Sequence, residues 1–299
     1  MTRAAPSAAR EPWSIGRVAA WAQEDFRARG FDSPRLDAEL VIAHALGVDR
    51  IRLILERDRP LSPAELAGVR ELIKRRRGGE PVSYILGSRE FYGLPFRVAP
   101  AVLIPRADTE TLVEVALAAT RARSMHGALL DLCTGSGCVA IAFARQRRTW
   151  RVTGADIEEA ALEVARHNAL RLGVLPNVDF VQGDLFDAVA SPRRFDAIVG
   201  NPPYIPSTLV EQLDPGIRDF EPRIALDGGA DGLDIVRRIV SGAAERLTPG
   251  GSLALELHYD QAERVSALLA AAGFGEIAVH RDHAGHQRVV SAKQGHGAA

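Results

Sequence analysis

The sequence is poor in several features that would place it in another class of protein. It contains two cysteines, Cys133 and Cys138, which suit a reducing compartment better than a disulfide-bonded secreted protein. No window of 18 apolar residues is free of charges and turn-forming residues, so we expect no transmembrane span. The opening stretch MTRAAPSAAREP has no continuous apolar segment, so we expect no signal peptide. These absences together predict a cytoplasmic protein.

The composition is that of an ordinary globular chain. Hydrophobic residues make up 46% and charged residues 25%. A length of 299 residues is typical of two domains, or of one domain of about 200 residues with an appendage. The net charge of −1 does not indicate a nucleic-acid-binding protein, but it is unevenly divided. Residues 1–105 carry 17 basic against 13 acidic side chains, and residues 106–299 carry 20 against 25. The basic front part suits either an anionic partner near RNA or a solvated helical surface.

The first 80 residues predict a small helical domain. Ser14 can cap one helix, Ser33-Pro34 can begin a second, and residues 62–65 (SPAE) form the capping box of a third. The third helix ends in the basic run 74–77, which complements the helix dipole in a last turn. Contact with nucleic acid is the alternative interpretation of that run.

The remainder of the chain predicts a hairpin followed by an α/β domain. Residues 81–105 are rich in β-branched and aromatic residues interrupted by Gly and Pro. Helical and strand patterns then alternate, as in a doubly wound, mostly parallel sheet, with an antiparallel edge after a short last connection. The expected strands are 128–133, 151–156, 178–184, 195–200, 252–257, 275–281 and 286–292. We therefore expect a helical domain over 1–80, a β-hairpin linker over 81–105 and a seven-stranded Rossmann-like domain over 106–299.

A glycine-rich turn follows the first strand of this domain. In residues 131–138 (DLCTGSGC), Gly135 and Gly137 allow a tight turn at the start of a helix, where free N–H groups can meet a ligand. With Ala140 the turn also fits G-x-G-x-x-A, so alone it does not separate a dinucleotide from another adenosyl cofactor. Asp156 ends the next strand, 21 residues after Gly135, where a carboxylate can accept hydrogen bonds from ribose hydroxyls. Capping of the following helix is the alternative for Asp156.

A third strand ends in Gly183-Asp184-Leu185-Phe186, where the adenine of such a cofactor is expected. Leu185 or Phe186 could pack on the ring, and Asp184 could accept a hydrogen bond from its amino group. Helix capping explains Asp184 equally well.

The most specific motif is Asn201-Pro202-Pro203-Tyr204, after the strand FDAIVG. The two prolines make the turn rigid, because each fixes φ and lacks an N–H group. The side-chain carbonyl of Asn201 and the backbone carbonyl of Pro202 can then accept both hydrogens of a planar –NH₂ group, with Tyr204 supplying an aromatic face. Orientation of this kind can contribute several kcal/mol to catalysis.

These motifs resemble those of S-adenosylmethionine-dependent methyltransferases that act on amide or exocyclic nitrogen. Over about residues 30–292 the sequence resembles one family in particular, the protein-glutamine N-methyltransferases of peptide chain release factors (HemK/PrmC). The resemblance is carried by the segments PRLDAELVIAHALG, RRRGGEPVSYILGSREFYGLPFRV, LIPRADTETLVE, DLCTGSGCVAIA, GNPPYI, FEPRIAL and RDHAGHQRVV. It implies a cytoplasmic enzyme that methylates the glutamine side-chain nitrogen in the Gly-Gly-Gln loop of class I release factors, with no membrane and no direct nucleic acid required.

The resemblance also implies roles for individual residues. Contacts to S-adenosylmethionine, which leaves as S-adenosylhomocysteine, are implied for Cys133, Thr134, Gly135, Ser136, Gly137, Asp156, Leu185 and Asn201, and we add Asp184. The residues Asn201, Pro202, Pro203 and Tyr204 are expected to bind the target glutamine, with Asn201, Pro202 and Tyr204 catalytic. The helical domain and hairpin are implied to help hold the protein substrate. No general base is evident, so proton loss is expected to follow methyl transfer.

The sequence departs from the family pattern at a few positions. Cys133 and His258 stand where Gly is common, and Ala107 stands where Pro is common. The variant DLCTGSGC is equally typical of the sister enzyme that methylates a glutamine of a large-subunit ribosomal protein, which is the first alternative function. A DNA adenine-N6 methyltransferase would share Asn-Pro-Pro-Tyr but usually needs a target-recognition domain and a basic cleft. A non-catalytic or dehydrogenase-like Rossmann protein is the third alternative.

No metal site is expected. His280, His283 and His286 are spaced three apart, but a strand–loop–strand segment would scatter their imidazoles. Cys133 and Cys138 lack the C-x-x-C spacing of a redox pair.

Overall fold

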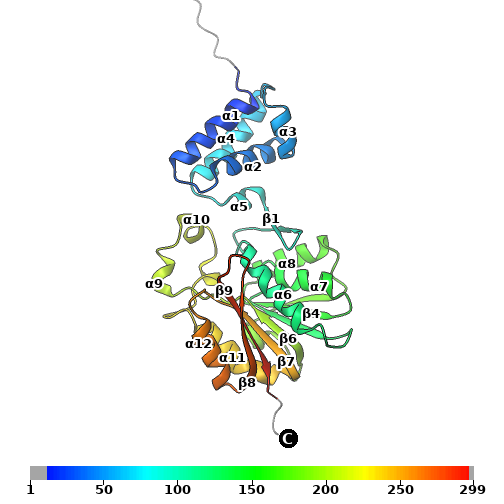
Figure 1. Ribbon diagram of the computed structural model, residues 1–299. Helices are drawn as coiled ribbons and strands as arrows, with labels where there is room; N and C mark the ends of the chain where they lie inside the picture. The colour runs from blue at the N-terminus through cyan, green and yellow to red at the C-terminus, as the bar shows by residue number, and fades with distance from the viewer. Residues whose placement is uncertain (1–11, 296–299) are drawn as a thin grey trace, which may run out of the picture. The chain divides into compact units, whose positions relative to one another are not determined.

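The computed structural model describes residues 12–295, which form two compact units that divide between Leu86 and Gly87 (Figure 1). Each unit buries its own apolar side chains, the first in an all-helical core and the second on both faces of a sheet. Within the described residues, no helix is long and apolar enough to cross a membrane.

The described residues of the first unit form five helices, three of which begin with a side-chain cap. The Ser14 hydroxyl accepts a hydrogen bond from the backbone of Arg17, and Ser62 and Glu65 complete the predicted capping box. Ser33 makes no side-chain capping bond, and Asp49 caps a short helix that the sequence pattern did not predict. The helices are α1 (Ile15–Ala28), α2 (Pro34–Leu46), α3 (Arg50–Leu55), α4 (Pro63–Arg77) and α5 (Val82–Leu86).

The basic run at the end of α4 is held within the first unit. Arg75 pairs with Glu80, Arg77 pairs with Asp25, and Arg76 pairs with Asp37 at 2.8 Å. The Arg76 guanidinium also lies 3.7 Å from the centroid of the Phe31 ring. These contacts support the structural interpretation of the run, because three of its four cations already have acidic partners in the protein.

The second unit contains the predicted seven-stranded sheet, in the order β5-β4-β3-β6-β7-β9-β8. Neighbouring strands from β5 to β7 are parallel, and β9 is antiparallel to both β7 and β8, which confirms the fold class. A separate hairpin of β1 (Ser88–Phe91) and β2 (Leu94–Arg97) precedes it. The sheet strands are β3 (Ala128–Leu132), β4 (Arg151–Asp156), β5 (Val178–Gln182), β6 (Phe195–Gly200), β7 (Leu247–Glu256), β8 (Phe274–Arg281) and β9 (Gln287–Gln294).

Helices cover both faces of this sheet. One face packs against α6 (Glu110–Ala119), α7 (Cys138–Gln146) and α8 (Glu159–Arg171), and the other against α11 (Asp234–Arg246) and α12 (Ala262–Ala271). The connection between β6 and α11 is long and carries only short helical turns, α9 (Ser207–Val210), α10 (Pro215–Arg218) and η3 (Arg223–Ala225). Two further turns, η1 (Ala107–Thr109) and η2 (Leu185–Ala188), border the sheet edge where the strands end.

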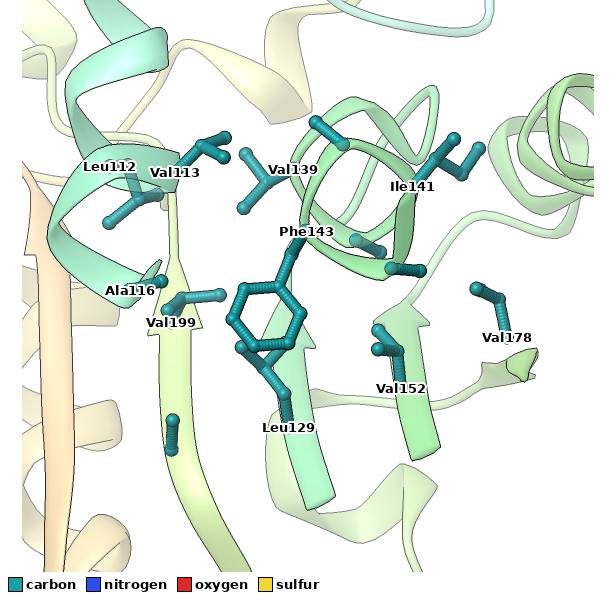
Figure 2. Packing of buried hydrophobic residues seen from close by; sticks show 14 of the residues in the cluster. Leu112, Val113, Ala116, Leu129, Val139, Ile141, Phe143, Val152, Val178 and Val199 are labelled. Atoms are coloured by element: carbon teal, nitrogen blue, oxygen red, sulfur yellow. The ribbon is translucent and has the colours of Figure 1, made fainter. Parts of the chain in front are cut away.

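Phe143 lies at the centre of the first apolar layer. Figure 2 shows its ring between α7 and the strands, close to Leu129 of β3, and the side chain is fully buried. It also makes an edge-on contact with Trp150, with ring centroids 5.5 Å apart.

We expect Phe143→Ala to lower the free energy of unfolding of the second unit by about 3–5 kcal/mol, because it leaves a cavity in a close-packed layer. Urea unfolding followed by circular dichroism measures the loss. The exposed Leu170 offers a matched control, since Leu170→Ala removes apolar volume without creating a cavity. Equal free energies of unfolding for the two variants would contradict the prediction that Phe143 stabilises this apolar layer.

Candidate active site

A cavity opens at the carboxyl ends of the central strands of the second unit. Its volume is about 220 Å³, and its walls come from the segments after β3, β4, β5 and β6 together with residues 101–109. The chain order reverses between β3 and β6, the place where open α/β sheets bind ligands. Of the predicted site residues, the cavity is lined by Cys133, Thr134, Gly135, Ser136, Asp156, Asp184, Leu185, Asn201 and Pro203. Gly137, Pro202 and Tyr204 lie outside its lining.

The glycine-rich turn after β3 is held in place by a buried carboxyl group. Asp131 is 1% exposed, and its Oδ2 accepts hydrogen bonds from the Thr134 hydroxyl at 2.6 Å and the Ala140 N–H at 3.1 Å. Burial raises the pKa of Asp131 to about 7 despite these two donors. Asp131 therefore joins both ends of the turn and fixes its path past the cavity.

Glycine is needed at the two positions of the turn for different physical reasons. Gly135 has a φ of +53° and faces open space, where a Cβ would meet no atom within 4 Å. Gly137 has a φ of +77°, and a Cβ there would lie 3.0 Å from Ile141 and Phe180. Gly135 therefore leaves room at the cavity, whereas Gly137 allows α7 to pack closely. Cys133 also has a positive φ, +56°, which explains why Gly is common at that position.

Asp156 links the turn to the end of β4. Its Oδ2 accepts a hydrogen bond from the Gly135 N–H at 2.8 Å, and its Oδ1 accepts one from the Glu158 N–H at 3.1 Å. Burial raises the pKa of this carboxyl group. The N-cap of α8 is Glu158 and not Asp156, so Asp156 acts here as an acceptor at the cavity wall.

The segment after β5 separates the two candidates for adenine packing. Leu185 lines the cavity, whereas Phe186 packs into the second apolar layer, close to Gly242. The Asp184 carboxylate accepts a hydrogen bond from Arg238 Nη2 at 2.8 Å, and Arg238 also lines the cavity. Asp184 and Arg238 thus form a polar rim beside an apolar wall.

The Asn-Pro-Pro-Tyr turn after β6 is tied to three residues that the sequence analysis did not assign to the site. Asn201 Nδ2 donates a hydrogen bond to the Thr109 hydroxyl at 3.3 Å. The Tyr204 hydroxyl donates to Glu256 Oε1 at 3.3 Å, and the Tyr204 carbonyl accepts from Gln261 Nε2 at 2.9 Å. With Nδ2 engaged, Asn201 Oδ1 is the amide atom left for a ligand, and it has no hydrogen-bond partner within residues 12–295.

A partly buried ion pair joins the cavity wall at Arg106 to a buried carboxylate. Glu221 Oε1 accepts from Arg106 Nη2 at 2.5 Å, and Oε2 accepts from the Ile104 N–H at 3.2 Å. Arg106 lines the cavity, and Glu221 is 5% exposed. The two partners are 115 positions apart in the sequence, so no local pattern could have paired them.

The cavity suits an adenosyl ligand by the chemistry of its lining. Asp156 offers a carboxylate to hydroxyl groups, Gly135 leaves space beside the turn, and Leu185 and Ile235 supply apolar surface. The described residues hold no cluster of three or more His, Cys, Asp or Glu side chains that could bind a metal ion.

We expect both cavity thiols to be unreactive in the folded protein. Burial raises the pKa of Cys138 to about 12 and also raises the pKa of Cys133, so that almost no thiolate exists at neutral pH. Ellman's reagent at pH 7 should therefore detect neither thiol in the native protein and both after unfolding in urea. Rapid native labelling would contradict these raised pKa values.

Comparison with known proteins shows the class to which the chain belongs. Residues 18–87 match the model of the PrmC N-terminal domain, and residues 108–212 match that of the methyltransferase small domain. The fold also resembles the Thermus thermophilus 16S rRNA N2 G1207 methyltransferase in complex with AdoMet and guanosine, with a TM-score of 0.51, 21% identity, and coverage of 70% of this chain and 50% of that one. Fold, cavity and family models together define a methyltransferase that uses S-adenosylmethionine.

Full-length relatives identify the family within this class. The chain is 44% identical to the release factor glutamine methyltransferase of Geobacter sulfurreducens, over 95% of this chain and 98% of that protein. It is 39% identical to the enzyme of the same name from Rhodopirellula baltica, over 94% and 96% of the two chains. The chain belongs to the release factor glutamine methyltransferase family.

Proposed function

We propose that this protein transfers the methyl group of S-adenosylmethionine to the side-chain nitrogen of the glutamine in the Gly-Gly-Gln loop of class I release factors. The observation that carries the proposal is the Asn201 amide, which lines the cavity with its nitrogen bound to Thr109 and its oxygen left for a ligand. An acceptor at this place suits the N–H₂ group of a glutamine amide.

The residues proposed to hold the cofactor are those that meet in the cavity. We assign the ribose hydroxyls to Asp156 and the adenine to Leu185 and Asp184. The remaining contacts are assigned to Cys133, Thr134, Gly135, Ser136 and Asn201, with Gly137 shaping the turn. When bound, S-adenosylmethionine supplies a methyl group activated by a positively charged sulfur.

The target glutamine is proposed to bind at the Asn-Pro-Pro-Tyr turn. An amide nitrogen is a weak nucleophile, because its lone pair is delocalised into the carbonyl group. Asn201 Oδ1 and the Pro202 carbonyl accept its two N–H groups, which orients the nitrogen and stabilises the positive charge that develops on it. Pro203 and Tyr204 limit the movement of the side chain, and one proton leaves after methyl transfer.

We further propose that residues 12–86 and the β1–β2 hairpin help to hold the protein substrate, which would be met in the cytoplasm, where translation takes place. The first unit exposes Ile51, Ile54 and Leu55 on α3, and exposed apolar side chains grouped on one helix suit contact with another protein. No direct nucleic acid contact is needed, since the internal pairing of Arg75, Arg76 and Arg77 leaves little free positive charge at the end of α4.

The test is an intact-mass assay with S-adenosylmethionine and a purified class I release factor, beside the same factor with Gly-Gly-Gln changed to Gly-Gly-Ala. We expect the first factor alone to gain the mass of one CH₂ group. Modification of neither factor would contradict the proposal, and parallel assays with large-subunit ribosomal protein and with DNA would test the two alternative substrates.

A further inference from the structure

The Asn-Pro-Pro-Tyr turn can make few hydrogen bonds of its own. Pro202 and Pro203 each fix φ but have no N–H group, so the turn lacks two of the donors that would otherwise hold its path. The angle ψ stays free at both prolines, and rotation about it changes the direction in which the Pro202 carbonyl points. A fixed direction therefore requires contacts from outside the turn.

Gln261 supplies such a contact at the far end of the turn. Its Nε2 donates a hydrogen bond to the Tyr204 carbonyl at 2.9 Å, and its Oε1 accepts one from the His258 N–H at 3.0 Å. Both partners are backbone groups, one able only to accept and the other only to donate, so the side-chain amide fits in one orientation. Gln261 is 4% exposed, so little water can compete for these bonds.

The side chain of Gln261 does this in place of capping its own helix. Gln261 is the N-cap residue of α12, yet within the described residues its side chain makes no capping hydrogen bond. Short polar side chains are favoured at this position because they reach the first N–H groups of the helix. The longer glutamine reaches instead to the turn after β6, 57 positions earlier in the sequence. This favours a role at the turn over a role in starting the helix.

Residues 226–232 (LDGGADG) pack against the same turn from the connection that follows it. The Gly228 N–H donates a hydrogen bond to the Ile205 carbonyl at 2.8 Å. A Cβ at Gly228 would lie 2.9 Å from the Cα of Tyr204, and a Cβ at Gly232 would lie 2.2 Å from the Tyr204 carbonyl oxygen. Only glycine permits so close an approach, which leaves the backbone of Tyr204 no room to move on this side.

We propose that Gln261 is a positioning residue that fixes the Asn-Pro-Pro-Tyr turn from its far end, so that the acceptor groups of the turn keep their direction toward the substrate glutamine. Thr109 holds the near end through the Asn201 side chain at 3.3 Å. Gln261 acts through the backbone of Tyr204 and does not itself line the cavity. This role rests on the proposed function of the turn.

The first experiment compares wild type and Gln261→Ala on the same release factor. We expect kcat to fall on the order of 10–100-fold, because the acceptors are no longer held in one direction. Affinity for S-adenosylmethionine, measured by calorimetry, should stay within about threefold of wild type. A variant with wild-type kcat, or one that loses kcat and cofactor affinity by the same factor, would overturn the proposal.

Gln294→Ala is the matched control. Gln294 is half-buried at the end of β9, and its Nε2 donates to the Ala244 carbonyl of α11 at 2.7 Å, which is also a bond from a glutamine to a backbone carbonyl. It does not line the cavity. This variant should keep wild-type kcat and cofactor affinity at a temperature where it is folded. A loss of kcat equal to that of Gln261→Ala would contradict a specific role for Gln261.

Gln261→Glu tests the single hydrogen bond to the turn. The introduced carboxylate can accept from the His258 N–H but cannot donate to the Tyr204 carbonyl, whereas the protonated carboxyl group can do both. Burial favours the protonated form, so kcat relative to wild type at the same pH should rise several-fold as the pH is lowered from about 8 to about 5.5. Tyr204, His258 and Asp260 are present in both proteins, so their titration cancels in this ratio. The ratio for Gln261→Ala should not change with pH, and an unchanging ratio for Gln261→Glu would overturn the proposal.

One readout is independent of methyl transfer. The Ile205 and Ser207 N–H groups donate to backbone carbonyls within residues 226–232 at 3.0 and 2.9 Å, so their hydrogen exchange reports local opening at the end of the turn. Mass spectrometry should show exchange at least about tenfold faster in Gln261→Ala than in wild type, and unchanged exchange would contradict the positioning role. Absence of wild-type activity on release factors would instead contradict the proposed function, so the two failures can be told apart.

Discussion

Replacing Asn201 by alanine should reduce methylation of the release factor to background, a loss of kcat of at least about 10²–10³-fold. The Asn201 amide is held by the Thr109 hydroxyl at 3.3 Å, and its oxygen is the acceptor available at the cavity. Alanine removes that acceptor without adding bulk, so the cavity stays open. Radiolabel transfer measures turnover, and calorimetry should show that most of the affinity for S-adenosylmethionine is kept.

A matched control shows whether the effect is specific to the asparagine at the cavity or follows from removing any partly buried asparagine. Asn177 is half-buried and donates a hydrogen bond to the Trp150 carbonyl at 3.3 Å, away from the cavity. Asn177→Ala should lower the melting temperature slightly and retain full turnover at the assay temperature. Normal turnover in Asn201→Ala would rule out the proposed mechanism.

Replacing Asp156 by alanine should weaken S-adenosylmethionine binding by roughly 10- to 150-fold, the range expected for losing hydrogen bonds to a charged group. Two effects combine at this position. The variant loses the acceptor proposed for the ribose hydroxyls, and it releases the Gly135 N–H that Asp156 holds at 2.8 Å. Calorimetric titration measures the dissociation constant, and saturating cofactor should restore a large part of the turnover.

The control for this prediction removes a carboxylate from the neighbouring strand. Asp179 lies exposed on β5, and Asp179→Ala should leave cofactor affinity unchanged. An Asp156→Ala variant with wild-type affinity would show that other residues bind the ribose hydroxyls. The Asp156 carboxylate would then only hold the glycine-rich turn in place.

Local patterns were sufficient for most of the fold. The seven strands of the second unit were predicted because each is a short apolar run bounded by turn residues, and the structure confirms them within a few residues at most ends. The exception is β7, which begins at Leu247 and not near 252, because it continues through Pro249 and Gly250 with a shift of register opposite β6. In the first unit, α3 was missed because six residues are too few for a helical period to show.

The cavity was also largely predictable, because each residue proposed for it lies at the end of a strand or in the segment after it. In a parallel sheet the carboxyl ends of neighbouring strands meet at one edge, so Gly135, Asp156, Leu185 and Asn201 could be placed together from their order alone. A strand–turn–helix pattern does not distinguish a residue that lines a cavity from one beside it. Gly137, Pro202 and Tyr204 belong to the same motifs and lie outside the lining.

Sequence by itself thus determined the class of fold, the family and the turns that carry the site, because these depend on short-range patterns and on order along the chain. The tertiary structure decided which side chains from other segments form hydrogen bonds with those turns. Thr109, which bonds Asn201, and Glu256, which bonds Tyr204, come from segments separate from the turn that holds their partners, and no spacing rule relates them. Their hydrogen bonds exist only because the folded sheet brings η1, β7 and the turn after β6 to one edge, where buried polar groups must find partners in one another.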